Sequence, residues 1–421
     1  MVRQPYRWAG VGARVPKGAL VHALRHTMAT RLAEDGASAS EIQHILGHER
    51  LNTSQSYIDA RFPRYPRRTL RAKEPWASVS KIFATVEEHE RGRERMQALV
   101  WRGGDLVEAA EVPTPVHAPG WVLVEPAYVG ICGTDLHISH GEHPRAHPGL
   151  VLGHEIVGRL AGATADLQAG TAVFVNPLLS CGTCRACRRN RAQVCERLRL
   201  IGIDVDGGAA DLVAVPADHL VALPASLDFR RAALIEPVAV AVRAVRRSGL
   251  RVGDRAHVVG AGPIGLLVAT CARLGGASSV TFSEPAPQRA EAATAFGFDL
   301  VDDAAQDQSA DVVFDCTGHP SVSPTVLRWA AAGGTVVTVG AYPGVVGVNL
   351  QEVMFRELTI IGTRVYASED VTAAVALVAQ AMIDVSRLVT NVLPLQDGAE
   401  AITRLRAGGE LKVLIEGPAA T

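Results

Sequence analysis

The hydrophobic positions divide the chain into three stretches with different periodicities. In the first, apolar residues recur every three or four positions, as at Leu20, Leu24 and Met28, which predicts helices. In the second, short β-rich runs such as 97–101 and 122–130 are broken by glycine and proline and predict a compact β domain. From about residue 250, apolar strands alternate with helical stretches. The third stretch therefore predicts a parallel, doubly wound α/β sheet.

The order of these elements predicts how the chain is organised. The strands expected in the α/β sheet are 257–260, 280–283, 312–315 and 336–340. After residue 370, an amphipathic helix with Val378 and Met382 on its apolar face precedes an apolar run at 411–415, which predicts a last strand that returns to the β domain. We predict a helical segment, a linker, a β domain, an α/β domain and a return to the β domain, at 1–70, 71–95, 96–245, 246–365 and 366–421.

Charge is distributed unevenly along the chain. Its 421 residues carry 42 basic and 43 acidic side chains, a formal net charge of −1. The first 95 residues hold 17 basic and 10 acidic side chains, whereas the rest hold 25 and 33. This asymmetry indicates two parts of different origin, and the basic part favours polyanions such as DNA.

Composition excludes several classes of protein. With 48% hydrophobic residues, the chain can bury a full core, so it is neither disordered nor fibrous. No apolar signal segment follows Met1, and glycines interrupt the longest apolar stretch, so no membrane span is predicted. The seven cysteines do not have the pattern of a secreted disulfide framework. We therefore expect a cytoplasmic protein.

Four of the cysteines crowd into one short loop with the spacing C-x2-C-x2-C-x7-C, namely Cys181, Cys184, Cys187 and Cys195. Four thiolates so close in sequence can enclose one tetrahedral Zn²⁺ and leave no open position. The alternative is a set of free or redox-active thiols, a use that rarely places four cysteines in one loop. The pattern predicts a structural zinc site.

A second group of residues offers mixed ligands. Cys132 lies in GICGTDLH, and the pair His154 and Glu155 begins 22 positions later. One thiolate, one imidazole and one carboxylate with an open fourth position are typical of catalytic zinc, although Cys132 and His154 taken singly would be core residues. Glu236 is acidic within an otherwise apolar run and is a candidate ligand, or a partner of a ligand.

A glycine-rich motif begins the α/β domain. A predicted strand runs into G-x-G-x-x-G and then into an apolar helix, with the motif residues Gly260, Gly262, Pro263, Ile264 and Gly265. This arrangement binds the pyrophosphate of a dinucleotide at the helix N-terminus. Glu284 ends the next strand, 24 residues after Gly260, where a carboxylate binds the ribose hydroxyls and favours NAD. Arg289 nearby leaves NADP as the alternative.

In this order, the motifs resemble those of zinc-dependent medium-chain alcohol dehydrogenases over residues 96–421. The resemblance implies a GroES-like β domain and a Rossmann domain, with a homodimer or homotetramer as the assembly. It implies a catalytic zinc at Cys132, His154 and Glu155, a structural zinc at the four-cysteine loop, and a proton relay through Thr134 and His137. The Glu-Pro at Glu236 is similar to the sorbitol and butanediol dehydrogenase branch, in which that glutamate lies at the zinc.

These parts predict a chemistry. Zinc in such a site acts as a Lewis acid that lowers the pKa of a substrate hydroxyl. The proton would leave through Thr134 and then His137, while hydride passes to the nicotinamide. We predict oxidation of a secondary alcohol, diol or polyol by NAD⁺. A protein that keeps the zinc fold without turnover is the alternative, and it would be expected to lack a catalytic ligand.

The N-terminal segment has a resemblance of its own. The residues VHALRHT at 21–27, LGH at 46–48 and TSQSY at 53–57 resemble the C-terminal catalytic boxes of tyrosine recombinases, the phage integrase family. By that likeness Tyr57 would attack a DNA phosphodiester, and His22, Arg25 and His48 would bind the transferring phosphate. The remaining catalytic Arg and Lys of that family precede these boxes. The alternatives are an inactive fusion, a vestige or start-site error, and weak non-specific DNA binding.

Overall fold

The computed structural model describes residues 94–301 and 307–420. The predicted N-terminal helices, the linker and the recombinase-like residues His22, Arg25, His48 and Tyr57 lie outside this part. The chain divides into two compact units, and the second contains 96–111 and everything described from 122 onward. In the described part of the first unit, both the backbone N–H and the hydroxyl of Thr114 donate to the Glu94 carbonyl. The elements below build the second unit.

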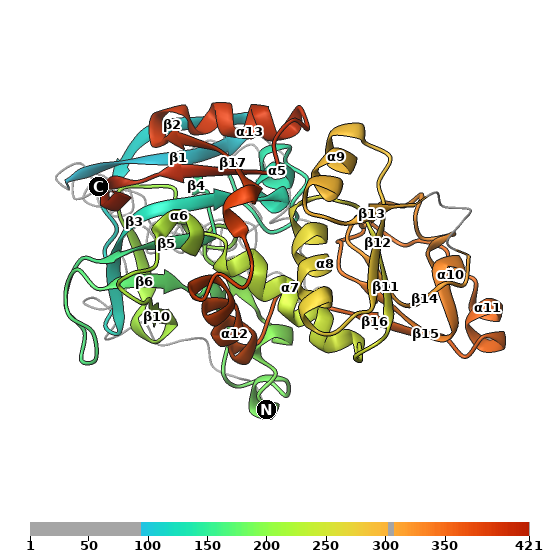
Figure 1. The fold of residues 1–421 in the computed structure, drawn as a ribbon. Helices are drawn as coiled ribbons and strands as arrows, with labels where there is room; N and C mark the ends of the chain where they lie inside the picture. The colour runs from blue at the N-terminus through green and yellow to red at the C-terminus, as the bar shows by residue number, and fades with distance from the viewer. Residues whose placement is uncertain (1–93, 302–306, 421) are drawn as a thin grey trace, which may run out of the picture. The chain divides into compact units, whose positions relative to one another are not determined.

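The β-rich part of this unit is built on a seven-stranded sheet (Figure 1). Its strand order is β10-β6-β5-β3-β18-β17, and β9 also pairs with β3. The strands are β3 (Trp121–Ile131), β5 (Glu155–Leu160), β6 (Ala172–Val175), β9 (Val213–Pro216), β10 (Leu220–Ala222), β17 (Val389–Pro394) and β18 (Lys412–Glu416). Two smaller sheets join β2 (Leu106–Pro113), β1 (Arg95–Gly103) and β4 (Leu150–Val151), and β7 (Leu178–Leu179) with β8 (Arg199–Leu200).

The last strand of the chain lies in the middle of this sheet. β18 pairs antiparallel with β3, so that Leu414 is opposite Gly130, and Gly130 is also opposite Glu155 of β5. The prediction that the C-terminal strand returns to the β-rich part is confirmed by this pairing. Because side chains alternate along a strand, this register brings residues from three distant segments to one place behind the site.

The second sheet is parallel, with the order β13-β12-β11-β14-β15-β16. Its strands are β11 (Arg255–Val259), β12 (Ser279–Ser283), β13 (Asp299–Leu300), β14 (Ala310–Asp315), β15 (Ala330–Thr338) and β16 (Thr359–Gly362). The four predicted strands match β11, β12, β14 and β15. The two edge strands were not predicted, because β13 has only two residues and β16 only four, so neither is long enough to show a clear periodicity.

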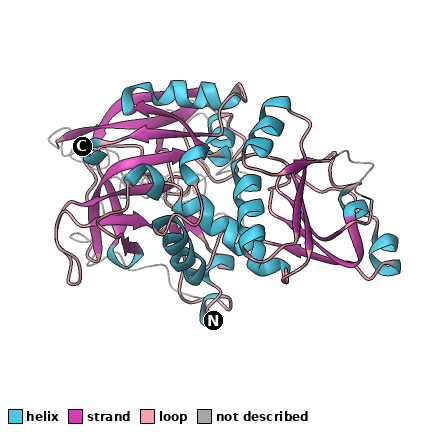
Figure 2. Ribbon diagram, in the orientation of Figure 1, coloured by secondary structure: helices cyan, strands magenta, loops and turns pink. Residues whose placement is uncertain are grey.

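Helices cover the sheets, as Figure 2 shows. They are α5 (Gly133–Ser139), α6 (Phe229–Ala232), α7 (Ile235–Ser248), α8 (Pro263–Leu274), α9 (Pro287–Ala295), α10 (Val326–Trp329), α11 (Leu350–Phe355), α12 (Ser368–Ala379) and α13 (Gly398–Arg406). The predicted helix through Met382 ends earlier, because Ala381 has a left-handed φ of 55° and the Met382 N–H donates to the Leu377 carbonyl. Met382 is therefore half-exposed instead of buried.

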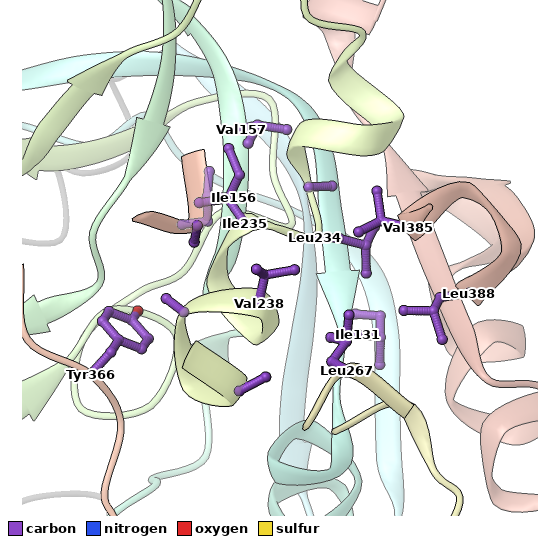
Figure 3. Packing of buried hydrophobic residues seen from close by; sticks show 14 of the residues in the cluster. Ile131, Ile156, Val157, Leu234, Ile235, Val238, Leu267, Tyr366, Val385 and Leu388 are labelled. Atoms are coloured by element: carbon purple, nitrogen blue, oxygen red, sulfur yellow. The ribbon is translucent and has the colours of Figure 1, made fainter. Parts of the chain in front are cut away.

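The core is continuous between the two sheets. Helix α7 packs against α8 and α12. In Figure 3, Ile131 of β3, Val238 of α7 and Leu267 of α8 lie in one cluster of buried side chains. Among the described residues, no helix combines the length and the apolar composition that crossing a bilayer requires.

Candidate zinc and cofactor sites

Cys132 is held at the junction of β3 and α5. It is the N-cap of α5: its Sγ accepts the Thr134 N–H at 3.2 Å, and its own N–H donates to the Asp135 carboxylate at 2.9 Å. This reciprocal capping satisfies backbone donors at the start of the helix. It also directs the sulfur atom to a defined position.

His154 lies in the connection between β4 and β5, and its ring contacts this sulfur atom. Its Nε2 lies 2.9 Å from Cys132 Sγ, and its Nδ1 lies 3.7 Å from an Asp135 oxygen. His154 and Asp135 are both buried, and His154 Nδ1 has no hydrogen-bond partner in the described part of the chain. The ligand atoms of Cys132, Asp135 and His154 all lie within 4.8 Å of one another. The structure thus brings together two predicted ligands and one unpredicted acid.

This group fits a zinc ion. Burial lowers the pKa of His154, but the negative charges of Cys132 and Asp135 raise it by more, so it stands well above its usual range. The pocket therefore favours a positive charge, and a sulfur and an imidazole nitrogen are ligands that Zn²⁺ prefers. Cys132 and His154 would bind the metal, and Asp135 would orient the His154 ring through Nδ1.

The two glutamates lie beside this group. The Glu155 carboxylate is bound by Lys412 Nζ, at 2.7 and 2.9 Å, so the structure does not bring it into the group of three ligand atoms. Glu236 is buried in the first turn of α7, where burial and then the Glu155 charge raise its pKa to about 7. The Tyr366 hydroxyl is buried next to it, and burial and then the Glu236 charge raise the pKa of that phenol.

Asp135, Lys412 and Tyr366 are site residues that sequence reasoning missed. The sequence does contain a pattern that could have revealed Asp135, because an acid three residues after Cys132 matches a capping box at the start of a helix. No sequence pattern could have revealed Lys412, since it lies 257 residues from Glu155 and only the sheet register brings the two together. Tyr366 lies between elements in an irregular stretch, where periodicity carries no information.

Thr134 and His137 both lie on α5. Thr134 is half-buried in the first turn, beside Cys132. His137 has a side chain that is 64% exposed, and its Nδ1 lies 2.9 Å from the Glu142 carboxylate. Three residues apart on one helix, they face the same side. The described hydrogen bonds do not link them directly, and His137 is placed where solvent reaches it.

The four cysteines of the loop converge in space. The sulfur atoms all lie within 4.8 Å of one another, and three of the sulfur–sulfur distances among Cys181, Cys184, Cys187 and Cys195 are 3.4, 3.9 and 3.9 Å. A tetrahedron of Zn–S bonds about 2.3 Å long has edges of about 3.8 Å, so these distances fit zinc. The Thr183 N–H is the largest of several influences that lower the pKa of Cys181 to about 5, whereas burial raises the pKa of Cys187 to about 11.

The glycine-rich loop has the geometry of a turn from strand to helix. Gly260 follows β11 with φ of +92°, and Gly262 is the N-cap of α8, ahead of Pro263, Ile264 and Gly265 in its first turn. Gly262 faces open space, which leaves room for a phosphate. Glu284 accepts the N–H of Ala261 at 2.8 Å, so its carboxylate lies against the loop. Arg289 is exposed on α9.

Comparisons with known proteins show the family to which the chain belongs. Residues 118–225 match the alcohol dehydrogenase GroES-like domain, and 263–380 match the zinc-binding dehydrogenase domain. The chain belongs to the zinc-dependent medium-chain alcohol dehydrogenase family. Its predicted GroES-like and Rossmann folds are confirmed by solved structures of that family. Residues 8–64 match the phage integrase family, in agreement with the N-terminal resemblance.

Three individual proteins show the range of relatives. The chain is 34% identical over 313 residues to 2-dehydro-3-deoxy-L-galactonate 5-dehydrogenase of Pseudoalteromonas atlantica, covering 70% of this chain and 92% of that one. It is 34% identical over 321 residues to L-galactonate-5-dehydrogenase of Escherichia coli, covering 73% and 92%. A Sinorhizobium meliloti structure classed as a zinc-binding dehydrogenase, with NADP bound, is 33% identical with a TM-score of 0.73, covering 77% and 100%.

Proposed function

We propose that this protein oxidises a secondary hydroxyl of a polyol or polyhydroxy acid to a ketone, with NAD⁺ as the hydride acceptor. The observation that carries the proposal is the contact between the half-buried Cys132 and the buried His154, which offers two protein ligands, with the buried Asp135 behind it. Such a set leaves positions for a further ligand and for substrate. Relatives named for dehydrogenation of sugar acids support the substrate class.

Each residue of the proposed site has a separate role. When bound, zinc supplies Lewis acidity and the nicotinamide accepts hydride. Cys132 and His154 would hold the metal, Asp135 would orient the His154 ring, and Glu236, whose charge acts on His154, would serve as a further ligand or as a partner of a ligand. Thr134 would accept the hydroxyl proton as it gives up its own, and the exposed His137 would pass that proton to water. The four-cysteine loop holds a second zinc that stabilises the fold.

The preference for NAD rests on Glu284. Its carboxylate lies against the glycine-rich loop through Ala261, next to the position of the adenosine ribose in this class of fold. A carboxylate there binds two ribose hydroxyls and repels a 2′-phosphate. Arg289, the nearby cation that would favour NADP, is exposed on α9.

The experiment is a cofactor and substrate survey on the purified full chain. Reduced nicotinamide would be followed by absorbance with NAD⁺ or NADP⁺ and a panel of vicinal diols, sugar alcohols and aldonic acids, with and without a zinc chelator. We expect chelator-sensitive turnover with NAD⁺ and at least one polyhydroxy substrate. A turnover rate that the chelator does not change would contradict the proposal. The Cys132→Ser protein is the matched inactive control.

We propose that the protein assembles as a homo-oligomer through the β16 edge of the parallel sheet. β16 pairs only with β15 in the described sheet, and the segment from residue 345 through this strand exposes large apolar side chains: Val345, Val348, Leu350, Met354, Phe355 and Ile360. An exposed patch of this kind beside a free edge strand is typical of an interface. Light scattering should give a dimer or tetramer that Phe355→Glu dissociates, whereas Val252→Glu, at an exposed valine elsewhere, leaves it intact.

For the N-terminal segment, we propose weak, salt-dependent DNA binding without strand transfer. Its net positive charge and its match to the phage integrase family favour this role. Fluorescence anisotropy with a labelled duplex should show binding that weakens steeply as salt is raised. Binding that is insensitive to salt would contradict it. We also propose a cytoplasmic location, since none of the seven cysteines forms a disulfide bond.

A further inference from the structure

Asp315 is the last residue of β14, at the edge of the parallel sheet where its strands end. The residue is 1% exposed, and its carboxylate accepts four hydrogen bonds. The N–H and the hydroxyl of Thr317 and the N–H of Gly318 donate to Oδ1, at 3.0, 2.7 and 3.3 Å. The Tyr342 hydroxyl donates to Oδ2 at 2.6 Å. Because Tyr342 follows β15 and the other donors follow β14, one buried carboxylate joins two loops.

The backbone of Asp315 holds the second loop as well. Its carbonyl accepts the N–H groups of Val339 and Gly340, both at 2.9 Å. A Cβ atom on Gly340 would lie 2.2 Å from the Gly318 nitrogen, so the two loops approach more closely than a side chain there would allow. Within the described part of the chain, Tyr342 supplies the one side chain of the second loop that bonds to the Asp315 carboxylate.

These loops border the proposed cofactor site. The strand order of the sheet reverses between β11 and β14, and a dinucleotide binds in the crevice beyond the carboxyl ends of the strands at such a point. The Cys316 N–H donates to the Val259 carbonyl at 3.0 Å, and a Cβ atom on Gly260 would lie 2.7 Å from the Thr317 methyl carbon. The loop after β14 therefore packs against the glycine-rich turn.

The two sides of the crevice face different halves of a dinucleotide. Glu284, which we propose binds the adenosine ribose, follows β12 on one side of β11. Strands β14 and β15 lie on the other side of β11. Because the pyrophosphate lies at the glycine-rich turn between them, the nicotinamide half extends toward the loops after β14 and β15.

The Tyr342 hydroxyl satisfies an oxygen atom that has no other partner among the described residues. Burial, and then the bond to Asp315, raise the pKa of the Tyr342 phenol, so it stays protonated and donates at neutral pH. Without this donor, Oδ2 would belong to a buried charge that is not fully hydrogen-bonded. Such a group is unfavourable, so the carboxylate and the loops that it joins would shift toward another donor.

We propose that Tyr342 is a positioning residue that, through Asp315, holds the loop after β15 in the shape that the nicotinamide half of the cofactor requires. This inference rests on the proposed cofactor site. It adds a residue that lies outside the glycine-rich motif and outside the metal ligands. Tyr342 sets the affinity for the nicotinamide half, whereas Glu284 sets the affinity for the adenosine half.

The test compares two ligands on the full chain by isothermal titration calorimetry: NADH, which has both halves, and ADP-ribose, which lacks the nicotinamide. For Tyr342→Phe, we expect NADH to bind about tenfold more weakly, because one hydrogen bond to a charged group is lost, and ADP-ribose to bind within about twofold of the wild type. Tyr128→Phe is the matched control. Its hydroxyl donates to the Glu416 carboxylate at 3.2 Å in the β-rich part, and its loss should change neither affinity.

A second variant tests the route through Asp315. In Tyr342→Phe combined with Asp315→Asn, the neutral amide no longer requires the missing donor, so NADH affinity should return to within about threefold of the wild type. A double variant that binds NADH as weakly as Tyr342→Phe would overturn this route. Wild-type NADH affinity in Tyr342→Phe, or an equal loss of affinity for both ligands, would overturn the inference as a whole.

Failure of the wider proposal looks different. If the wild-type chain binds neither NADH nor ADP-ribose, the cofactor site itself is wrong, and the role of Tyr342 fails with it. If the wild type binds both ligands and Tyr342→Phe changes neither affinity, the cofactor site stands and only the role of Tyr342 is wrong.

Discussion

The two zinc-type sites of this chain are assembled in opposite ways. The four cysteines come from one loop between Cys181 and Cys195, and they surround a closed tetrahedral space. Cys132 and His154 come from separate sheet connections, and their neighbour Glu155 is bound by Lys412 from the end of the chain. A site within one loop suits a structural metal, because the metal alone orders it. A site held by several strands keeps its shape when substrate enters and leaves.

The two sites also differ in the charged and polar groups around them. In the loop, backbone N–H groups lower the pKa values of Cys181 and Cys184, whereas burial raises the pKa of Cys187 to about 11. Near Cys132 and His154, the described part of the chain holds three buried carboxylates, Asp135, Glu155 and Glu236, and Lys412 contacts Glu155. The proposed catalytic site should therefore depend more strongly on the charge of its metal, and the predictions below use this difference.

The largest effect is expected from Cys132→Ser. Removal of this ligand should lower the zinc content from two ions per chain to one and reduce turnover by more than about 100-fold. This is a larger loss of activity than substitution of a residue that only contacts a metal ligand usually causes. Metal analysis and NADH formation measure the two effects. Cys271→Ser is the matched control, because Cys271 is buried in α8 away from both clusters and should keep both metal ions. Full activity in Cys132→Ser would refute the assignment.

Cys184→Ser should chiefly lower stability. The buried Cys184 sulfur lies 3.4 Å from Cys187 Sγ, and loss of a structural zinc is expected to lower the free energy of unfolding by about 4 kcal/mol. Denaturant unfolding followed by circular dichroism measures this. Any fully folded fraction should still oxidise substrate. An unchanged unfolding curve with both zinc ions retained would argue against a structural metal in this loop.

Glu284→Ala should change cofactor preference and leave both zinc ions bound. Loss of hydrogen bonds from a charged group, worth about 1.5–3 kcal/mol, predicts a fall of roughly 10- to 100-fold in the NAD to NADP ratio of kcat/KM. Glu291→Ala, on the exposed face of α9, is the control and should leave the ratio unchanged. The same ratio in both variants would mean that Glu284 does not bind the ribose.

The smallest effect is expected from His137→Gln. His137 is largely exposed, so water can replace part of its proton transfer, and we expect kcat to fall by about tenfold, below the usual range for general acid–base groups. His140→Gln removes a neighbouring histidine that pairs with Asp105 on the surface and should have no such effect. If both variants retain wild-type kcat, His137 is not part of the proton path.

Prediction from the sequence worked where the information is local. The four-cysteine spacing, the glycine-rich turn and the strands β11, β12, β14 and β15 all depend on neighbours along the chain. The edge strands are too short to show a pattern, and the end of α12 depends on the left-handed Ala381. Local patterns therefore predicted the fold class and brought out the candidate metal ligands.

The partners of the ligands depend on the assembled sheet. Asp135 was visible only as part of a capping pattern, and its approach to His154 requires the fold. The pairing of Glu155 with Lys412 depends on the β3–β18 and β3–β5 registers, which no spacing reveals. The sequence pointed to Glu155 as a ligand because it is next to His154, whereas the structure places its carboxylate on a lysine.

The most direct test of the central claim is a stepwise chelation of the full-length protein, with zinc content, melting temperature and NADH formation measured on the same samples. The account predicts that activity is lost when the first zinc ion leaves, while the melting transition persists until the second is removed. Activity that survives complete removal of zinc, or that falls only when the protein unfolds, would contradict it.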